Sequence, residues 1–201
     1  MDVVCLDLEG VLVPEIWIAF AEKTGIESLK ATTRDIPDYN VLMRQRLDIL
    51  AAHNLKLADI QEVISGLQPM PGARAFLDSL RESYQVIILS DTFYEFAKPL
   101  MAQLNLPTLF CHKLIIDKSG AVIDYKLRQE DPKRASVKAL HSLQFKVYAA
   151  GDSYNDTSML GEADAGFLFR APANVIEEFP QYPVTNDFSE LRQLFDKAAA
   201  G

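Results

Sequence analysis

Four short runs of apolar and β-branched residues constrain the fold of this chain more than any other feature. They are VVCLDL at 3–8, QVIILSD at 85–91, KVYAAGD at 146–152 and AGFLF at 165–169. Successive positions, rather than alternate ones, are apolar, so both faces of each strand are expected to be buried, as in a parallel sheet covered by helices. Helical stretches separate the runs, and this alternation is typical of a doubly wound, Rossmann-like α/β fold with a parallel sheet.

Composition fits one such domain and excludes several kinds of partner. The chain has 201 residues, of which 49% are hydrophobic, and this is enough for a sizeable core. A formal charge of −8 and the lack of any Lys/Arg block argue against a nucleic-acid partner. No stretch approaches the roughly 20 apolar residues of a membrane-spanning helix, and MDVVCLDLEG lacks the basic region of a signal peptide. Cys5 and Cys111 are too far apart in the sequence for a redox motif. From these observations together we expect a cytoplasmic protein, in a reducing compartment.

The segment 14–70 interrupts the alternation of strands and helices. It shows helical periodicity without a strand, and PEIWIAFAEKTG begins with Pro and ends with Gly, as helices commonly do. We therefore expect a small helical cap at 14–70, inserted after the first strand of a core domain formed by 1–13 and 71–201. A β-hairpin is predicted at 113–127, where two alternating runs flank the turn KSG. This hairpin could serve as the interface of a homodimer.

A long helix expected at about 39–53 places an arginine within its apolar face. At about 100° per residue, that face carries Tyr39, Leu42, Met43, Ile49, Leu50 and His53. Arg46 falls in the middle of this face, whereas Arg44 points the other way. Arg46 could snorkel, with its stem covering apolar surface. Alternatively, it could point inward and hold a carboxylate or phosphate through two hydrogen bonds.

Polar residues stand where three of the apolar runs stop. Asp7 and Glu9 follow the first run, Ser90 stops the second, and Asp152 stops the third. Ligands of doubly wound sheets bind beyond the carboxyl ends of the strands, so these groups are expected at one edge. The motif DPKR adds Lys133 at the start of a helix, and GDSYND adds Asn155 and Asp156.

This combination suits magnesium and a phosphate. Mg²⁺ prefers octahedral oxygen ligands and is usually held by one or two carboxylates together with substrate phosphate oxygens. Asp7 and Asp152 could supply the carboxylates, and the main-chain carbonyl of Glu9 a third oxygen. The Ser90 hydroxyl and the Lys133 ammonium could then take the remaining phosphoryl oxygens. Asp7 could attack phosphorus to form an aspartyl-phosphate, while Glu9 moves protons as a general acid and base.

The motifs DLEGV, LSD, DPKR and GDSYND occur in this order, each at a strand end or a helix start. Together they resemble the signature of the haloacid dehalogenase-like phosphotransferases, which is D-x-D-G-[TV], a Ser or Thr after the second strand, a distant Lys, and G-D-x-x-x-D. The resemblance covers almost the whole chain and implies an Mg²⁺ cofactor held by Asp7, the Glu9 carbonyl and Asp152, with Asp156 supporting them. Glu9 stands where most of the phosphatase branch has Asp. The dehalogenase branch usually lacks this acid, so Glu9 favours phosphoryl chemistry.

Within that family, the cap resembles that of the phosphoserine phosphatases. There, an acid shortly after the first motif contacts the substrate amino group, and an Arg in an L-R-x-R helix holds the carboxylate. VPE offers Glu15 for the first role, and MRQRL offers Arg46 for the second. Periodicity and resemblance therefore agree on an inward-facing Arg46.

Two departures from the usual phosphoserine phosphatases place larger polar groups near the site. The chain has LSDTF where two glycines usually follow the Ser, and GDSYND where GDGAND is usual. These larger groups are Asp91, Thr92, Ser153 and Tyr154. Of them, we expect Asp91 and Thr92 to contact substrate, together with Ser90, Lys133 and Asn155. With DLEG, this set is similar to phosphoserine phosphatases that also pass the phosphoryl group to homoserine.

The sequence thus predicts an Mg²⁺-dependent phosphatase acting on phosphoserine, with water and homoserine as acceptors. Two alternatives stay open, namely a phosphatase of another small phosphorylated metabolite and a non-catalytic phosphate-binding module. His53, His112 and His141 have no metal-ligand spacing, and we expect each to be structural or at the surface.

Overall fold

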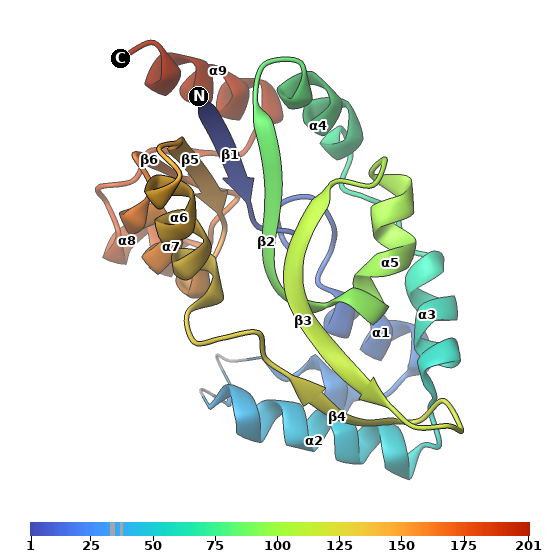
Figure 1. Ribbon diagram of the computed structural model, residues 1–201. Helices are drawn as coiled ribbons and strands as arrows, with labels where there is room; N and C mark the ends of the chain where they lie inside the picture. Colours follow the sequence, from blue (N-terminus) through green and yellow to red (C-terminus); the bar gives the residue numbers. More distant parts are fainter. Residues whose placement is uncertain (33–34, 37) are drawn as a thin grey trace.

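A mostly parallel sheet of seven strands forms the centre of the computed structural model, which describes residues 1–32, 35–36 and 38–201 (Figure 1). The strands lie in the order β4-β3-β2-β1-β5-β6-β7. Their bounds are β1 Asp2–Leu6, β2 Gln85–Phe93, β3 Thr108–Ile116, β4 Val122–Lys126, β5 Lys146–Gly151, β6 Ala165–Phe169 and β7 Val184–Thr185. Only β4 runs antiparallel to its neighbour within the described sheet. The predicted doubly wound α/β fold is confirmed.

Helices cover both faces of this sheet, and in the described ranges three more, the first three α-helices of the chain, lie beyond the end of β1 (Figure 1). They are α1 Ile16–Thr24, α2 Tyr39–Ala52, α3 Leu57–Ser65, α4 Ala73–Arg81, α5 Tyr94–Gln103, α6 Pro132–Ser142, α7 Thr157–Glu162, α8 Ala173–Glu178 and α9 Phe188–Ala199, with short 3-10 turns η1 Glu27–Lys30 and η2 Tyr154–Asp156. Along β1, Val4 and Leu6 pack in the layer of α4, α5 and α9, while Val3 and Cys5 pack in the layer of α6, α7 and α8. Two buried faces explain why successive strand positions are apolar. None of the helices in the described ranges is long and apolar enough to cross a membrane.

The sequence prediction differs from the structure at three strands. β3 begins at Thr108, so its first half pairs parallel with β2 before its second half forms the predicted hairpin with β4. β2 continues past Ser90 to Phe93, with a register shift against β3 between Leu89 and Phe93. The apolar run stops earlier than the strand because the polar side chains there belong to the site. β7 has two residues, too few to produce a periodic signal.

The helices α1, α2 and α3 lie between β1 and α4 in the sequence, and they gather beyond the end of β1 to which its arrow points (Figure 1). The first of them ends at Gly25 with φ of +70°, as the sequence predicted. The tip of the β3–β4 hairpin reaches this group, because the Leu57 N–H donates to the carbonyl oxygen of Gly120 at 2.9 Å. Arg44 also pairs with Asp124 of β4 at 2.7 Å. We call 14–70 the cap, and its domain boundaries stay a prediction.

The inner face of α2 is close to the face expected from periodicity. It buries Leu42, Met43, Arg46, Leu47 and Leu50. His53 is exposed because the helix ends at Ala52, so it lies at the surface, as expected of this histidine, and not on the apolar face where periodicity placed it. Arg44 points the other way, with its guanidinium 5.3 Å from the centre of the Tyr125 ring.

Candidate active site

Asp7 directly follows β1 and lies where the chain turns sharply away from the sheet. Its N–H donates to the carbonyl oxygen of Ala150 at 3.0 Å, which fixes it beside the end of β5. The turn uses Gly10 at φ of +78°, and a Cβ there would come within 2.4 Å of Oδ2 of Asp152. Glycine at this position therefore permits both the left-handed turn and the close approach of the Asp152 carboxylate.

Lys133, on the first turn of α6, is shared by three carboxylates. Its side chain is only 2% exposed, and its Nζ lies 2.9 Å from Asp7, 2.7 Å from Asp156 and 3.9 Å from Asp91. Burial opposes the charged form, but the three negative charges outweigh it and raise the pKa of Lys133 well above its usual value. The lysine is therefore a fixed positive charge beside Asp7.

An acidic cluster lies next to this lysine. Asp7, Asp152 and Asp156 each place one carboxylate oxygen within 4.8 Å of the others. Burial first, and then the charge of Asp156, raises the pKa of Asp7 well above its usual value and that of Asp152 to about 7. Carboxylates this close together repel one another unless bound protons or a cation reduce their negative charge.

Both carboxylate oxygens of Asp156 already accept hydrogen bonds from other groups of the protein. Its Oδ1 accepts from Lys133 at 2.7 Å, and its Oδ2 accepts the N–H groups of Asp152 and Ser153 at 2.9 and 3.1 Å. Asp7 and Asp152 are therefore the carboxylates better placed to face a cation, and oxygen donors with excess negative charge fit a hard divalent ion. The role of the Glu9 carbonyl as a ligand stays a prediction.

Glu9 lies on the other side of the turn, where its environment differs from that of Asp7. Its carboxylate accepts the Ile16 N–H at 2.8 Å and a hydrogen bond from the Thr92 side chain. Burial, followed by the negative charge of Glu15, raises the pKa of Glu9 to about 7. A carboxyl group with that pKa can both give and take a proton near neutral pH.

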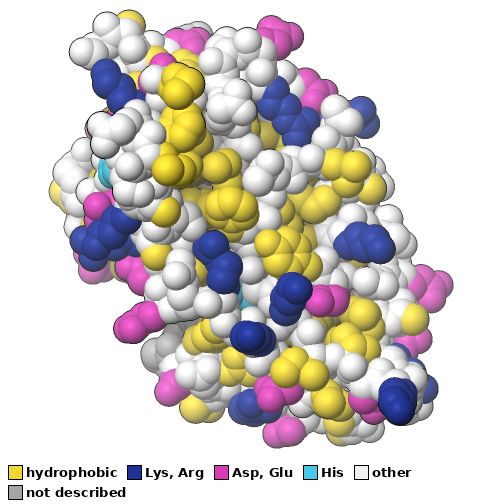
Figure 2. Space-filling view, in the orientation of Figure 1, with side chains coloured by type: hydrophobic (Ala, Val, Ile, Leu, Met, Phe, Trp, Pro, Cys, Tyr) yellow, Lys and Arg dark blue, Asp and Glu magenta, His cyan; other side chains and the backbone are white. Residues whose placement is uncertain are grey.

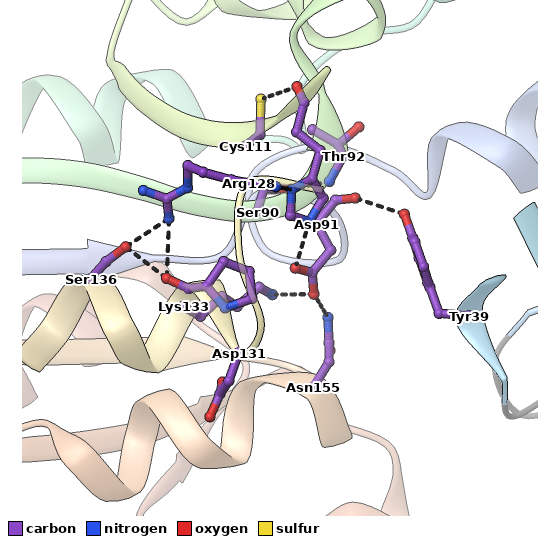
Figure 3. Close-up of polar contacts among 12 residues, drawn as sticks. Tyr39, Ser90, Asp91, Thr92, Cys111, Arg128, Asp131, Lys133, Ser136 and Asn155 are labelled. Carbon is purple, nitrogen blue, oxygen red and sulfur yellow. Dashed lines mark hydrogen bonds and ion pairs between the residues drawn. The ribbon is translucent and has the colours of Figure 1, made fainter. Parts of the chain in front are cut away.

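Ser90, Asp91 and Thr92 come from the last part of β2 (Figure 3). Ser90 and Thr92 are 4% and 6% exposed, and the Thr92 N–H donates to Oγ of Ser90 at 3.2 Å. Asn155 donates from its Nδ2 to Oδ2 of Asp91 at 2.8 Å. Asp91 and Asn155, both expected to contact substrate, therefore also bind each other.

Arg46 points from the cap into the interior. Its side chain is 8% exposed, its guanidinium carbon lies 4.6 Å from the centre of the Trp17 ring, and its Nη2 donates to the carbonyl oxygen of Ala31 at 2.9 Å. Burial lowers its pKa to about 10, so it stays charged at neutral pH. The snorkelling interpretation is wrong. Its buried Nε has no hydrogen-bond partner among the described residues.

Glu15, which is expected to contact the substrate amino group, is exposed at the start of α1. Its charge acts on the pKa values of Glu9, Asp152 and Arg46, which places it within electrostatic reach of all three. No ion pair joins it to Arg46 in the described part of the chain. The two residues are therefore near one another without neutralising each other.

Residues 1–164 match the family model of the haloacid dehalogenase-like hydrolases. The chain belongs to this family. The Phosphoserine phosphatase of Pseudomonas syringae pv. tomato is 68% identical over 199 residues, which are 99% of this chain and 84% of that protein. Phosphoserine phosphatase ThrH of Pseudomonas aeruginosa is 66% identical over 200 residues, which are 100% of this chain and 98% of that protein.

Two solved structures of phosphoserine phosphatases share the fold. A phosphoserine phosphatase in its apo form has 20% identity and a TM-score of 0.77, with 96% of this chain and 98% of that chain covered. A phospho-aspartyl intermediate analogue of phosphoserine phosphatase has 19% identity and a TM-score of 0.78, with the same coverage of 96% and 98%. At these identities the likeness establishes the common architecture.

Sequence reasoning missed some residues around this hydrolase site. His112, expected to be structural or at the surface, is 3% exposed, and its Nε2 lies 3.5 Å from Oδ1 of Asp91. Tyr39, assigned only to an apolar face, donates from its hydroxyl to the carbonyl oxygen of Asp91 at 3.2 Å. Neither residue sits in a local motif, so only the pairing of distant elements could have revealed them.

Proposed function

We propose that this chain is an Mg²⁺-dependent phosphoserine phosphatase that transfers the phosphoryl group through an aspartyl-phosphate on Asp7 to water and also to homoserine. The observation that carries the substrate assignment is the buried guanidinium of Arg46, whose Nε lacks a partner among the described residues. A buried donor without a partner is costly unless a ligand completes it, and a carboxylate matches the geometry of a guanidinium group. The names of the two Pseudomonas relatives support the same substrate.

In the first step, an oxygen of Asp7 would bond to phosphorus as the bond from phosphorus to the serine oxygen breaks. Lys133, at 2.9 Å from Asp7, acts against burial by favouring the ionised form of that carboxylate, and it balances the charge on the phosphoryl group. Asp7 and Asp152 would hold the magnesium ion together with the Glu9 carbonyl. When bound, Mg²⁺ supplies positive charge that neutralises the phosphoryl oxygens.

Glu9 would handle the proton in both steps. In its protonated form it gives a proton to the departing serine oxygen, and a pKa of about 7 makes this form available near neutral pH. In the second step it takes a proton from the attacking hydroxyl as the bond between phosphorus and Asp7 breaks. Water and homoserine both present such a hydroxyl, so either can accept the phosphoryl group.

The cap would select the amino acid. Arg46 would bind the substrate carboxylate, and Glu15 would bind the ammonium group. The Trp17 ring, 4.6 Å from the guanidinium, keeps Arg46 in its inward orientation. Ser90, Asp91, Thr92, Lys133 and Asn155 would surround the phosphoryl end.

The test begins with phosphate release from L-phosphoserine with Mg²⁺, with and without homoserine, while phosphohomoserine is assayed separately. Phosphohomoserine should form as free phosphate falls, because both acceptors compete for one aspartyl-phosphate. Phosphate release without phosphohomoserine would remove the transferase part of the proposal. No turnover of phosphoserine would favour another small phosphate, and tight binding of phosphate without turnover of any ester would favour a binding module.

A variant pair then tests the substrate carboxylate. Arg46→Met should raise KM for L-phosphoserine by about 100-fold, because a charge-assisted contact contributes about 1.5–3 kcal/mol. KM for phosphoethanolamine, which has no carboxylate, should change by less than about threefold. Arg44 lies on the outer side of the same helix, so Arg44→Met should change neither of the two KM values. Equal losses on both substrates would contradict the assignment.

Two further expectations accompany this proposal. The free, buried thiols of Cys5 and Cys111 are compatible with the reducing cytoplasm, where we expect the enzyme to act. Apolar side chains gather along the middle of the face shown in Figure 2, over β2 and β3, with Lys and Arg among them. On the hairpin, Ile115 and Ile123 are 43% and 54% exposed, which supports a homodimer interface that sedimentation can test.

A further inference from the structure

His112 of β3 connects the segment that follows β4 to the site through both ring nitrogens. Its Nδ1 accepts the main-chain N–H of Arg128 at 3.0 Å, which leaves the ring proton on Nε2 in the neutral form. That Nε2 faces Oδ1 of Asp91 at 3.5 Å. The ring is 3% exposed and lies 6.2 Å from the Phe93 ring, so its rotation is restricted.

Asp91 in turn contacts two of the residues that would surround the phosphoryl group (Figure 3). Its Oδ2 accepts from Asn155 at 2.8 Å and lies 3.9 Å from Nζ of Lys133. The other end of the Asn155 amide accepts from the hydroxyl of Ser153. The Asp91 carboxylate thus lies between His112 on one side and Lys133 with Asn155 on the other.

Arg128 also contacts the start of α6, the helix that carries Lys133. Its Nη2 donates to the carbonyl oxygen of Pro132 at 3.1 Å and to Oγ of Ser136 at 2.9 Å. Pro132 begins α6 and Ser136 lies about one turn further along, so the two acceptors are on either side of Lys133 in the helix (Figure 3). One residue therefore holds His112 with its main chain and the lysine-bearing helix turn with its side chain.

We propose that His112 is a positioning residue for phosphoryl transfer, which fixes the Asp91 carboxylate so that Lys133 and Asn155 are held in place beside Asp7. This inference rests on the proposed function, because it concerns the same site. A site whose groups are fixed before the reaction avoids the cost of ordering them during it. Loss of the His112 contact should therefore lower kcat more than it raises KM.

The two nitrogens of His112 can be tested separately. In His112→Gln, the amide nitrogen can occupy the place of Nε2 and still donate to Asp91. In His112→Asn, the shorter amide can accept from Arg128 but does not reach Asp91. We expect kcat for L-phosphoserine to stay within about threefold of wild type in H112Q and to fall about tenfold or more in H112N. If H112N equals or exceeds H112Q, the Arg128 contact is the important one and the proposal is overturned.

A double-mutant cycle tests whether His112 acts through Asp91. In an Asp91→Ala background, H112N should cost less than about twofold in kcat, because the group it orients is gone. Equal losses in both backgrounds, together with a lower melting temperature, would identify a structural role and refute the proposal. If D91A is too slow to assay, the order of H112Q and H112N decides alone.

A control and a second substrate separate this proposal from the proposed function. His141→Asn alters a surface histidine that pairs with Asp164 at 3.0 Å, and it should leave kcat unchanged. Every variant is also assayed with para-nitrophenyl phosphate. If wild type hydrolyses this ester but not phosphoserine, the proposed substrate fails, while the order of H112Q and H112N on the ester still tests His112.

Discussion

Replacing Lys133 by Met removes a buried ammonium while keeping most of the volume of the side chain. Lys133 is 2% exposed and lies 2.9 Å from Asp7 and 2.7 Å from Asp156. The variant leaves these carboxylates, and Asp91 at 3.9 Å, without their common counter-charge. We expect K133M to lose both activity and stability, and the pH dependence of the stability loss identifies its cause.

The size of the stability loss follows from the burial of the group. Removing one partner of a buried ion pair costs about 3–5 kcal/mol, because a charge is left without compensation. For a protein of this length, 1 kcal/mol corresponds to about 2–4 °C in melting temperature. K133M should therefore melt about 6–20 °C below wild type at pH 8 without magnesium. Its kcat should fall by about 10³-fold, because Lys133 stabilises the charge that is transferred.

The loss should shrink as the pH falls. In wild type, burial acts to raise the pKa of Asp91, but Lys133 and the His112 and Asn155 contacts hold it at about 2. Without the lysine, the folded-state pKa values of Asp7 and Asp91 rise relative to wild type, while in the unfolded chain they stay near about 3.9. A raised folded-state pKa of a carboxyl group means that stability is lost as pH rises above the unfolded value. The difference between K133M and wild type should therefore be small near pH 4 and complete above about pH 7.

Thermal unfolding followed by circular dichroism between pH 4 and 8 measures this difference. Lys138→Met is the matched control, because Lys138 lies on the same helix but is 55% exposed and 3.9 Å from Glu162. It should change stability by less than about 0.5 kcal/mol at every pH. If K133M is destabilised equally at pH 4 and pH 8, lost packing is responsible, and the argument from unpaired charges is refuted.

Three other substitutions test separate parts of the site. Gly10→Ala would place a Cβ within 2.4 Å of the Asp152 carboxylate, on a residue with φ of +78°. The Mg²⁺ concentration for half-maximal activity should therefore rise about tenfold or more. An unchanged concentration would contradict the assigned cation site. Tyr39→Phe removes a 3.2 Å hydrogen bond between cap and core, so KM for phosphoserine should rise about fivefold with little change in melting temperature. Glu15→Gln removes a negative charge that raises the pKa of Glu9, which is about 7 in wild type. The decrease of kcat/KM at high pH should therefore begin at a lower pH in the variant. Phosphoglycolate is the substrate for this test, because it has no amino group for Glu15 to bind. A profile that does not move would separate Glu15 from the proton transfer.

Local pattern in the sequence was sufficient for much of the fold. The four apolar runs correspond to β1, β2, β5 and β6, because burial on both sheet faces leaves a signal at every position of a strand. Helical periodicity was sufficient to place Arg46 on the buried face of α2, since the face on which a side chain lies depends on its spacing along the helix. The choice between snorkelling and an inward orientation needed more than periodicity. Asp7 and Asp152 could be placed together because parallel strands end at the same edge of a sheet.

Other parts of the site depend on contacts between distant segments. The pairing of Asp91 with Asn155 joins residues that are 64 positions apart, and the Tyr39 bond to Asp91 spans 52. No periodicity within one segment encodes such contacts, because folding must first bring β2 beside α2 and beside the turn that follows β5. For the same reason, the first half of β3 was missed, although its partner β2 was found.

The sequence by itself thus determined which chemical groups this protein brings to one sheet edge, because strand ends and helix faces are local properties. The tertiary structure alone decided which groups hold the others in place. His112 looked like a scattered histidine until the β3 register placed its ring between Arg128 and Asp91. The pKa values of Asp7, Glu9 and Asp152 likewise depend on burial and on charges from other segments, which exist only once the chain has folded.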